Sequence, residues 1–190
     1  MIFLQKEYFI HPNSIIDTKD IGKNTRIWAF VHILKDVRIG TNCNICDHCF
    51  IEGNVFIGNN VTIKSGVYLW DGITIEDNVF IGPNVVFTND KKPRSKVYPD
   101  KYLKTIIKES ASLGANSTIL PGIIIGKYSM IGAGSVVTKN VDDFTLVTGN
   151  PAFFKSFICK CTEEIKFKNN LYNCSCGEKY KLISGKVIKI

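Results

Sequence analysis

The chain contains no run of about 18 apolar residues, which is the minimum length for a helix that spans a membrane. Its N-terminal stretch carries Lys6 and Glu7 among apolar residues and lacks a small-residue cleavage site, so it does not fit a signal peptide. No helix-turn-helix or other motif for reading nucleic acids is present. These absences predict a cytoplasmic protein that binds neither a membrane nor a nucleic acid.

Histidine, methionine and tryptophan are scarce, with three, two and two residues, and the seven cysteines are an odd number. Seven cysteines cannot all pair within one chain, and reduced thiols fit the cytoplasm. Lysine and arginine outnumber aspartate and glutamate by 24 to 17, which gives a net charge of +7. Such a charge favours anionic ligands, although lysines spread over a solvated surface would give the same total. The lysines cluster in two places, residues 91–104 and the tail after residue 155.

A six-residue repeat organises the chain from residue 51 to residue 87. Written in sixes, this stretch reads IEGNVF, IGNNVT, IKSGVY, LWDGIT, IEDNVF and IGPNVV. The first place is always Ile or Leu and the fifth is always Val or Ile, while the third and fourth are mostly Gly, Asn, Asp or Pro. A period of six fits neither the 3.6-residue period of a helix nor the alternation of a plain strand. It predicts a parallel β-helix, in which each six forms a short strand and a corner.

The same register extends in both directions. Its first place falls on Ile15 and on every sixth residue up to 87, and after an interruption it returns at residues 107–137. Three sixes make one triangular coil, so equivalent places three sixes apart should stack about 4.8 Å from one another in neighbouring coils. The repeats predict about six coils within a domain over residues 1–155. Cys43 and Cys49 take the fifth place, where thiols fill the core, so a metal motif with Cys46 is not expected.

Two polar residues mark a candidate site beside the interruption. Asp71 and Asn89 each take the third place of a six, and their sixes are one full coil apart, so they should stack at one corner of adjacent coils. Asp and Asn are also ordinary turn residues. However, Trp70 lies beside Asp71, and after Asn89 the repeat breaks into a loop at about 90–106 that is rich in lysine and carries two prolines. A long excursion from a regular solenoid is usually functional.

The segments around this corner resemble a known family. The stretch VYLWDGITIEDNVFIGPNVVFTNDKKPRS is similar to hexapeptide-repeat N-acetyltransferases, which use acetyl-CoA to acetylate nucleotide-linked 3-amino sugars. The similarity continues through WAFVHI, LGANSTILPGIIIGKYSMIGAGSVVTKNV and LVTGNPA, and so spans nearly all of residues 10–155. The resemblance implies a left-handed parallel β-helix, a homotrimer with the acceptor sugar between subunits, and a product used in bacterial surface polysaccharides such as O-antigen.

The resemblance also implies roles for individual residues. The family's acidic residue and its FTN asparagine fall on Asp71 and Asn89, which would hold the acceptor amine near the thioester. Acetyl-CoA would lie along the outside of the last coils. The cofactor-binding residues implied there are Gly114, Ala115, Asn116, Ala133, Ser135, Lys139 and Lys155. The small residues would let the pantetheine arm approach the backbone, and the lysines would meet the phosphates.

Four further residues are candidates for binding the nucleotide sugar: Trp70, His32, Lys92 and Arg94. His32 ends the aromatic segment 28–32, which could stack on a base or a sugar, although aromatic clusters are often simple packing. Lys92 and Arg94 belong to the cationic loop. The segment FTND favours a dTDP-linked 3-amino-3,6-dideoxyhexose, with a UDP-linked 3-amino sugar as the main rival.

The acceptor is expected to be an amine rather than a hydroxyl. A hydroxyl acceptor needs a general base, commonly histidine, and no histidine follows His48. A sugar amine should titrate near pH 8 and needs orientation more than a strong base. The alternative from another class is a non-catalytic β-helix, acting as a scaffold or ligand-binding protein. Such a protein would need neither the Asp71–Asn89 stack nor the loop.

Residues 156–190 have a different character and predict a small β appendage. Two CxC pairs separated by twelve residues stand in this segment: Cys159, Cys161, Cys174 and Cys176. The pattern resembles a shortened zinc ribbon. Zinc ribbons usually use CxxC pairs, and both pairs here are one residue short, so zinc is considered but not favoured over free thiols. We therefore assign no metal ligands from the sequence.

Overall fold

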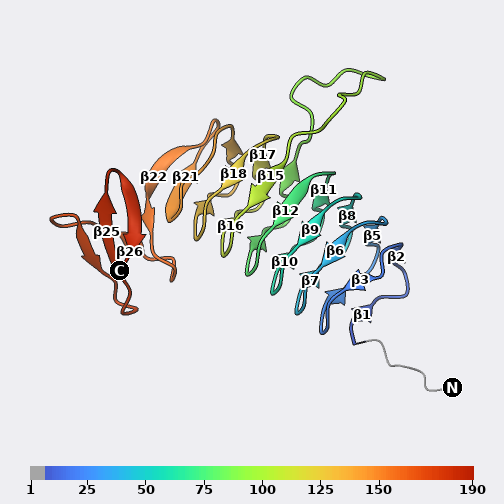
Figure 1. The fold of residues 1–190 in the computed structure, drawn as a ribbon, viewed down its shortest axis with the longest axis horizontal. Coiled ribbons are helices and arrows are strands. Elements are labelled where there is room, and N and C mark those ends of the chain that lie inside the picture. Colours follow the sequence, from blue (N-terminus) through green and yellow to red (C-terminus); the bar gives the residue numbers. More distant parts are fainter. Residues whose placement is uncertain (1–6) are drawn as a thin grey trace.

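The computed structural model describes residues 7–190, which form strands, turns and loops without any helix in that range. Short strands stack coil upon coil along the long axis of the molecule (Figure 1). The predicted all-β parallel β-helix is therefore confirmed. Residues 1–6, part of the stretch compared above with a signal peptide, lie outside the described range. Within the described range, no helix could cross a membrane.

Three sheets form the sides of the coils. The first contains β1 (Phe9–Ile10), β4 (Arg26–Ile27), β7 (Asn44–Ile45), β10 (Thr62–Ile63), β13 (Phe80–Ile81), β16 (Ser112–Leu113), β19 (Met130–Ile131), β21 (Thr145–Thr148), β22 (Phe153–Ile158) and β23 (Glu164–Ile165). The second contains β2 (Ile15–Ile16), β5 (His32–Ile33), β8 (Phe50–Ile51), β11 (Tyr68–Leu69), β14 (Val86–Phe87), β17 (Thr118–Ile119) and β20 (Val136–Val137). The third contains β3 (Asp20–Ile21), β6 (Arg38–Ile39), β9 (Phe56–Ile57), β12 (Ile73–Ile75), β15 (Thr105–Ile107) and β18 (Ile124–Ile125). The seven strands of the second sheet and the six of the third agree with the prediction of about six coils.

Residues at the first place of each six point into the coil. Ile27, Ile45, Ile63 and Ile81 pair in succession along the first sheet, each one coil from the next, and all are fully buried. This register is the one predicted from the repeat. A hydrophobic residue at every sixth place puts one buried side chain on each side of every coil. Cys43 and Cys49 are buried in the same core, as expected for thiols at the fifth place. Cys46 is only half-buried and accepts a hydrogen bond from Asn44 Nδ2 at 3.4 Å.

The predicted register is wrong by one residue at Ile15, whereas Ile21 in the same coil pairs with Ile39 as predicted. Ile16, not Ile15, pairs with Ile33, and Ile15 pairs with His32 on the outer side. Ile15 is accordingly 60% exposed. Ile16 and Ile33 are separated by one residue less than three full sixes, and the same holds for Ile10 and Ile27. The first coil is therefore one residue shorter than the next.

Asparagine recurs at the corners for a conformational reason. Asn42, Asn60 and Asn78 occupy the same corner of three successive coils and have φ values of 57°, 55° and 60°. Asparagine tolerates this left-handed region better than most residues. Phe30 and His48 occupy equivalent corners with φ values of 58° and 59°, and their rings stack at a centroid distance of 5.0 Å.

The interruption of the repeat is a loop that projects away from the coils (Figure 1). It connects β14 to β15. The predicted end at about 106 is slightly late, because Thr105 and Ile106 already pair with Ile73 and Thr74 of β12. The coil register resumes directly after the loop, so the excursion leaves the stack of coils intact.

The segment after the last coil folds against the end of the solenoid. Strand β22 runs antiparallel to β21 and crosses the predicted domain boundary at 155–156 before pairing with β23. A separate sheet contains β24 (Leu171–Asn173), β25 (Lys179–Ile183) and β26 (Lys186–Lys189). Phe144, which precedes β21, shares a second apolar cluster with residues of this segment, including Ile165 and Tyr180. The appendage is thus packed on the solenoid end, and its status as a separate domain remains a prediction.

Candidate active site

Asp71 and Asn89 lie beyond the ends of two neighbouring strands. β11 pairs with β14 through Tyr68 and Val86, which are one coil apart, and each site residue follows the end of its strand by two positions. Both are half-buried. The register therefore places a carboxylate and an amide in corresponding positions of adjacent coils, as the sequence predicts.

Two contacts from the preceding coil hold Asp71 in place, and its neighbour Trp70 is bonded to the following coil. Its backbone N–H donates to Glu52 Oε2 at 2.8 Å, and its Oδ2 lies 3.5 Å from Asn54 Nδ2. The neighbouring Trp70 donates its indole N–H to the carbonyl oxygen of Phe87 at 2.7 Å. This last bond joins the two coils that carry Asp71 and Asn89, and so fixes their relative position.

An aromatic hollow lies beside this corner on the outer face of the second sheet. It is lined by Phe30, His32, His48, Cys49, Phe50, Tyr68 and Trp70. The ring of Phe50 lies 5.5 Å from His32 and 5.8 Å from Trp70, and the ring of Tyr68 lies 6.2 Å from Trp70. Edge-on and tilted pairs of this kind leave ring faces on which a planar or sugar ring can stack.

The residues that line the aromatic hollow agree in part with the candidates named from the sequence. His32 and Trp70 were predicted from sequence and do line it, whereas Trp28, in the same aromatic segment as His32, lies on the first sheet and bonds Asn44. Phe50 and Tyr68 were missed. They follow His32 at intervals of one coil each and pair in succession with it. The repeat would have identified them if each outward-facing residue had been aligned with the residue one coil later.

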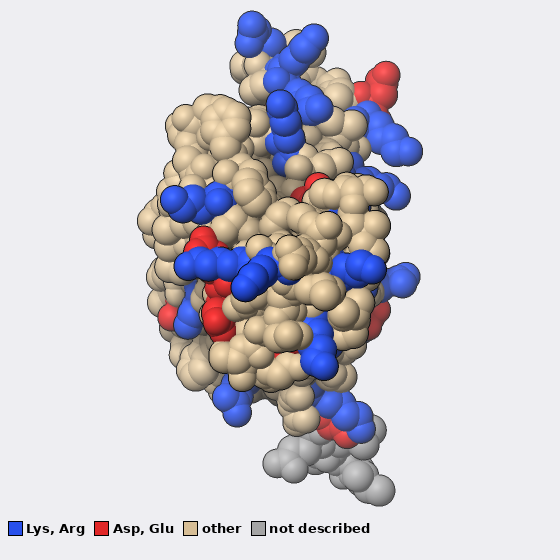
Figure 2. All heavy atoms as spheres, turned by 90° about the vertical axis from the view of Figure 1, so that its left-hand side faces the viewer, with Lys and Arg blue, Asp and Glu red and all other residues tan. Residues whose placement is uncertain are grey.

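The projecting loop brings cations close to Asn89. A second hollow at its base is lined by Asn89, Asp90, Lys91, Lys92, Pro99, Lys101 and Leu103. Residues 90–104 contain six Lys or Arg and two Asp. Figure 2 shows several Lys and Arg side chains at the top of the molecule, which is the side toward which the loop projects in Figure 1. Lys92 belongs to this hollow, whereas Arg94 lies farther out, exposed, with its guanidinium donating to Pro93 O at 3.0 Å. These cations suit an anionic ligand.

The residues implied in cofactor binding lie at corners of the later coils. Gly114, Ala115 and Asn116 join β16 to β17, and Ala133 and Ser135 lie between β19 and β20. A Cβ added at Gly114 would lie 2.5 Å from the backbone N of Ala133, so glycine is required there by the stacking of coils alone. The same crowding occurs at glycines of the first coils, far from this region.

The two polar groups in this set differ in access. Ser135 is fully buried and its Oγ accepts a hydrogen bond from Gly149 N at 3.1 Å, so its side chain faces inward and away from any ligand on the outer surface. Lys139, beyond β20, and Lys155, on β22, are exposed. Exposed backbone near Ala133 and these two lysines are therefore the groups in this set that could hold a phosphorylated cofactor.

Comparison with known proteins identifies the fold. A family model described as bacterial transferase hexapeptide (six repeats) matches residues 20–53, 54–89 and 104–139, more than half of the chain. The chain belongs to this family. The hexapeptide-repeat family and the transferase class predicted from the sequence are therefore confirmed.

Two kinds of relative are informative. A dTDP-3-amino-3,6-dideoxy-alpha-D-galactopyranose 3-N-acetyltransferase from Aneurinibacillus thermoaerophilus is 62% identical over 182 residues, which cover 96% of this chain and 95% of the relative. Among solved structures, a variant of AntD, an N-acyltransferase from Bacillus cereus in complex with dTDP and coenzyme A, matches with a TM-score of 0.59 at 24% identity over 76% of this chain and 81% of that one. A variant of GDP-perosamine N-acetyl transferase from Caulobacter crescentus, in complex with CoA and GDP-perosamine, matches with a TM-score of 0.53 at 21% identity over 78% of this chain and 56% of that one. At these identities the two structures support the fold alone.

Proposed function

We propose that the protein transfers the acetyl group of acetyl-CoA to the 3-amino group of a dTDP-linked 3-amino-3,6-dideoxyhexose. The galacto sugar in the name of the Aneurinibacillus relative is the first candidate. The observation that carries this proposal is the identity of 62% over nearly the whole length of both chains. The geometry supports it, because a carboxylate, an amide, an aromatic hollow and a cationic loop lie along one edge of the coils.

The chemistry requires orientation of a weakly basic amine. A sugar amine near pKa 8 is partly neutral at pH 7, so its lone pair can attack the thioester carbon without a strong base. Asp71 would attract the ammonium form and accept a hydrogen bond from the amine, while the amide oxygen of Asn89 would accept a second. A carbon–nitrogen bond then forms and the carbon–sulfur bond breaks. The proton released from nitrogen passes to Asp71, to water or to the departing CoA thiolate, which leaves a neutral amide.

The surroundings of the corner suggest where each part of the substrate binds. The faces of Phe50 and Trp70 would stack on the base or the sugar, with His32 and Tyr68 at the border of the aromatic hollow. Lys92 and Arg94 would meet the diphosphate. Acetyl-CoA would lie along the later coils, with its phosphates near Lys139 and Lys155. This division separates the acceptor residues from the cofactor residues, and the two sets can be tested independently.

A homotrimer is part of the proposal. The aromatic hollow is open on the outer face of one chain, and the projecting loop exposes Val97 and Tyr98 by 64% and 77%. A neighbouring subunit would cover such apolar side chains and complete the acceptor site. The reaction would take place in the cytoplasm, which fits seven cysteines of which none forms a disulfide. The acetamido sugar would then serve in the synthesis of a surface polysaccharide, such as O-antigen, as the resemblance implies.

The test is acetyl transfer across a panel of amino sugars. The protein is incubated with acetyl-CoA and, in turn, dTDP-3-amino-3,6-dideoxygalactose, its gluco epimer and a UDP-linked 3-amino sugar. The product is quantified by mass spectrometry, because exposed Cys161 and Cys176 would react with a thiol reagent used to detect CoA. We expect the dTDP-linked galacto sugar to give the highest kcat/KM. Preference for the UDP-linked sugar would contradict the assigned substrate. Binding of acetyl-CoA without any acetylated sugar would instead favour the non-catalytic alternative.

A further inference from the structure

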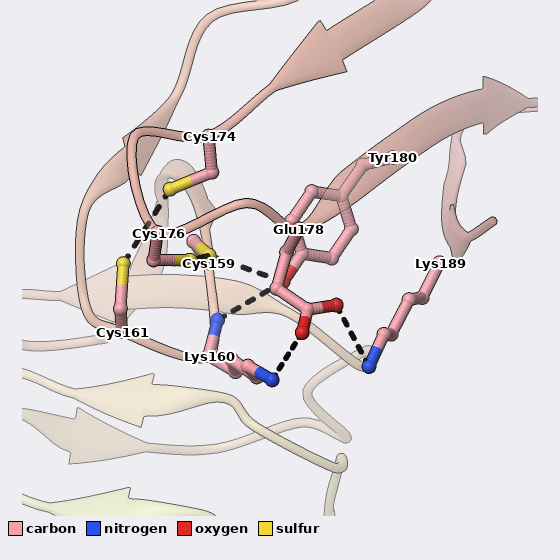
Figure 3. Close-up of polar contacts among 8 residues, drawn as sticks. All are labelled: Cys159, Lys160, Cys161, Cys174, Cys176, Glu178, Tyr180 and Lys189. Carbon is pink, nitrogen blue, oxygen red and sulfur yellow. Dashed lines mark hydrogen bonds and ion pairs between the residues drawn. The ribbon is translucent and has the colours of Figure 1, made fainter.

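The four cysteines of the C-terminal appendage converge at one point. Cys159, Cys161, Cys174 and Cys176 each offer a sulfur atom, and the four atoms lie within 4.8 Å of one another. Figure 3 shows the two CxC segments facing each other across this point. We propose that the four thiolates bind one zinc ion. The sequence pattern alone did not favour zinc, because each pair is one residue shorter than a CxxC pair.

The sulfur–sulfur distances fit a metal better than disulfides. Cys159 Sγ lies 3.6 Å from Cys176 Sγ, and Cys161 Sγ lies 3.5 Å from Cys174 Sγ. A tetrahedral zinc site with zinc–sulfur bonds of about 2.3 Å has sulfur–sulfur edges of about 3.8 Å. A disulfide would require about 2.05 Å. Both contacts join one CxC segment to the other, so an ion at the centre would link segments separated by β23 and β24.

The backbone builds the same turn twice. Cys159 N donates to Glu163 O and Thr162 N donates to Cys159 O, both at 2.8 Å. At the second CxC pair, Cys174 N donates to Glu178 O at 2.8 Å and Gly177 N donates to Cys174 O at 3.0 Å.

In each turn the residue after the second cysteine has a positive φ, 75° at Thr162 and 91° at Gly177. A residue with positive φ turns the chain sharply, and this lets both cysteines of a CxC pair face the same point. The repeated turn explains how pairs one residue short of a zinc knuckle still converge.

The surroundings of the cluster supply charge and hydrogen bonds suited to thiolates. The hydroxyl of buried Tyr180 lies 3.1 Å from Cys159 Sγ and can donate to it. Lys160 and Lys189 both pair with Glu178 (Figure 3), so two ammonium groups near the cluster offset the carboxylates of Glu178 and Glu163. Four thiolates around Zn²⁺ carry a net charge of −2, so the two lysines would limit the repulsion between the loaded site and these carboxylates.

One contact must change when the metal binds. Cys174 Sγ donates to Glu163 Oε2 at 3.2 Å, and a zinc-bound thiolate has no proton to donate. Glu163 also accepts hydrogen bonds from Ser175 Oγ at 2.6 Å and Tyr172 OH at 2.9 Å, so its carboxylate keeps two partners after that proton is lost. Release of this proton is part of metal binding, because a thiol must ionise to become a ligand.

The position of the cluster indicates what the ion would do. Buried Cys159 and Cys174 belong to the second apolar cluster, which contains six buried residues and packs the appendage against Phe144 at the end of the solenoid. A core of this size contributes little stability by itself, and small folds of this kind usually need a metal or disulfides. Zinc would hold the appendage together and so cover the last coil, as a terminal cap does in other solenoids.

The test measures metal content in the full-length protein purified under reducing conditions. We expect about one zinc per chain by elemental analysis. Replacement by Co²⁺ should give the intense thiolate-to-cobalt absorption of a tetrahedral CoS₄ site. The double variant Cys161→Ser/Cys176→Ser should lose at least nine-tenths of the zinc. Cys46→Ser, which changes a cysteine outside the cluster, should retain it.

Three results would overturn the proposal. They are absence of zinc after reconstitution of the reduced protein, iron in its place, or a native mass four hydrogens lower than the reduced chain, which would indicate two disulfides. Removal of zinc by a strong chelator should also lower the Tm of the full-length protein by several degrees, reversibly, and the chelator should not change the Tm of the Cys161→Ser/Cys176→Ser variant. An unchanged Tm on removal of bound zinc would contradict the role as a cap.

Discussion

The indole N–H of Trp70 donates a 2.7 Å hydrogen bond to the carbonyl oxygen of Phe87. These two residues belong to adjacent coils, and the chain continues from them to Asp71 and Asn89. The bond therefore fixes the offset between the coil that carries the carboxylate and the coil that carries the amide. Trp70 also lines the aromatic hollow beside them, so one side chain can both position the site and contact the substrate.

Trp70→Phe should lower kcat/KM for the amino sugar by about tenfold or more, because a small displacement of reacting groups is costly. The loss of one hydrogen bond should lower the free energy of unfolding by about 1 kcal/mol. Trp28→Phe is the matched control, since Trp28 Nε1 makes a comparable 2.8 Å bond to Asn44 Oδ1 on another sheet. Steady-state kinetics and urea denaturation of both variants give the comparison. Equal kinetic losses in the two would show that Trp70 has no special role.

Ile63→Ala should lower the free energy of unfolding by about 2–5 kcal/mol. Ile63 is fully buried and pairs with Ile45 and Ile81 in the coils on either side, so the stacked strands cannot close the cavity. Thr62→Ala, at the adjacent outward-facing position, should change the free energy of unfolding by less than about 0.5 kcal/mol. Denaturant titration of both variants distinguishes inward from outward places. A parental midpoint for Ile63→Ala would mean that the register is wrong.

Alkaline pH should destabilise the protein through its buried thiols. Burial raises the pKa of the Cys49 thiol from 9.0 to about 11, so the folded chain keeps a proton that the unfolded chain loses. The stabilising contribution is complete below pH 9 and is lost as pH rises from 9 to 11. It amounts to about 2 kcal/mol at the upper end, because one pKa unit corresponds to about 1.4 kcal/mol.

Urea titrations at several pH values test this prediction. Cys49→Ala should show a shallower fall in stability over this pH range than the parent. The same slope in both proteins would contradict the assignment to this thiol. Some slope should remain in the variant, since burial also raises the pKa of Cys43.

The loop cations should act on substrate binding more than on turnover. Lys92→Ala and Arg94→Ala are expected to raise KM for the nucleotide sugar several-fold with little change in kcat, because they would contact the diphosphate away from the reacting atoms. The effect should shrink at high salt, as it does for exposed charges. Lys186→Ala, an equivalent change on exposed β26 in the appendage, is the control. A fall in kcat without a change in KM would place these residues elsewhere in the mechanism.

The sequence predicts the coils well because the repeat is itself the physical cause of the fold. An apolar residue at every sixth place, with Asn or Gly at the corners, leaves only one way to bury the apolar side chains. The inward-pointing residue at the start of the first coil was not predicted correctly. Ile15 and Ile16 are both apolar, and only the pairing of Ile16 with Ile33 decides which one points inward.

The site was partly predictable for the same reason. Asp71 and Asn89 follow from the spacing of one coil, and His32, Phe50 and Tyr68 obey it as well. The buried orientation of Ser135 was not apparent, because the family motif marks the segment and not the direction of each side chain. The convergence of the C-terminal cysteines could not be read from their spacing either. It depends on positive φ values at Thr162 and Gly177, and of these two residues only the glycine indicates such a conformation in the sequence.

Kinetics of Asn89→Ala and Asp71→Asn with dTDP-3-amino-3,6-dideoxygalactose, together with calorimetric binding of acetyl-CoA, test the central claim most directly. Asn13→Ala and Asp17→Asn make the same changes at exposed positions near the N-terminus and serve as controls. We expect Asn89→Ala to lower kcat/KM by about 100-fold or more and Asp71→Asn by at least about tenfold, because each loses a group that orients the amine. Acetyl-CoA affinity should stay at the parental value in both. Near-parental turnover in both variants would contradict the account, since Asp71 and Asn89 would then be corner residues of the coils and the amine would be acetylated elsewhere.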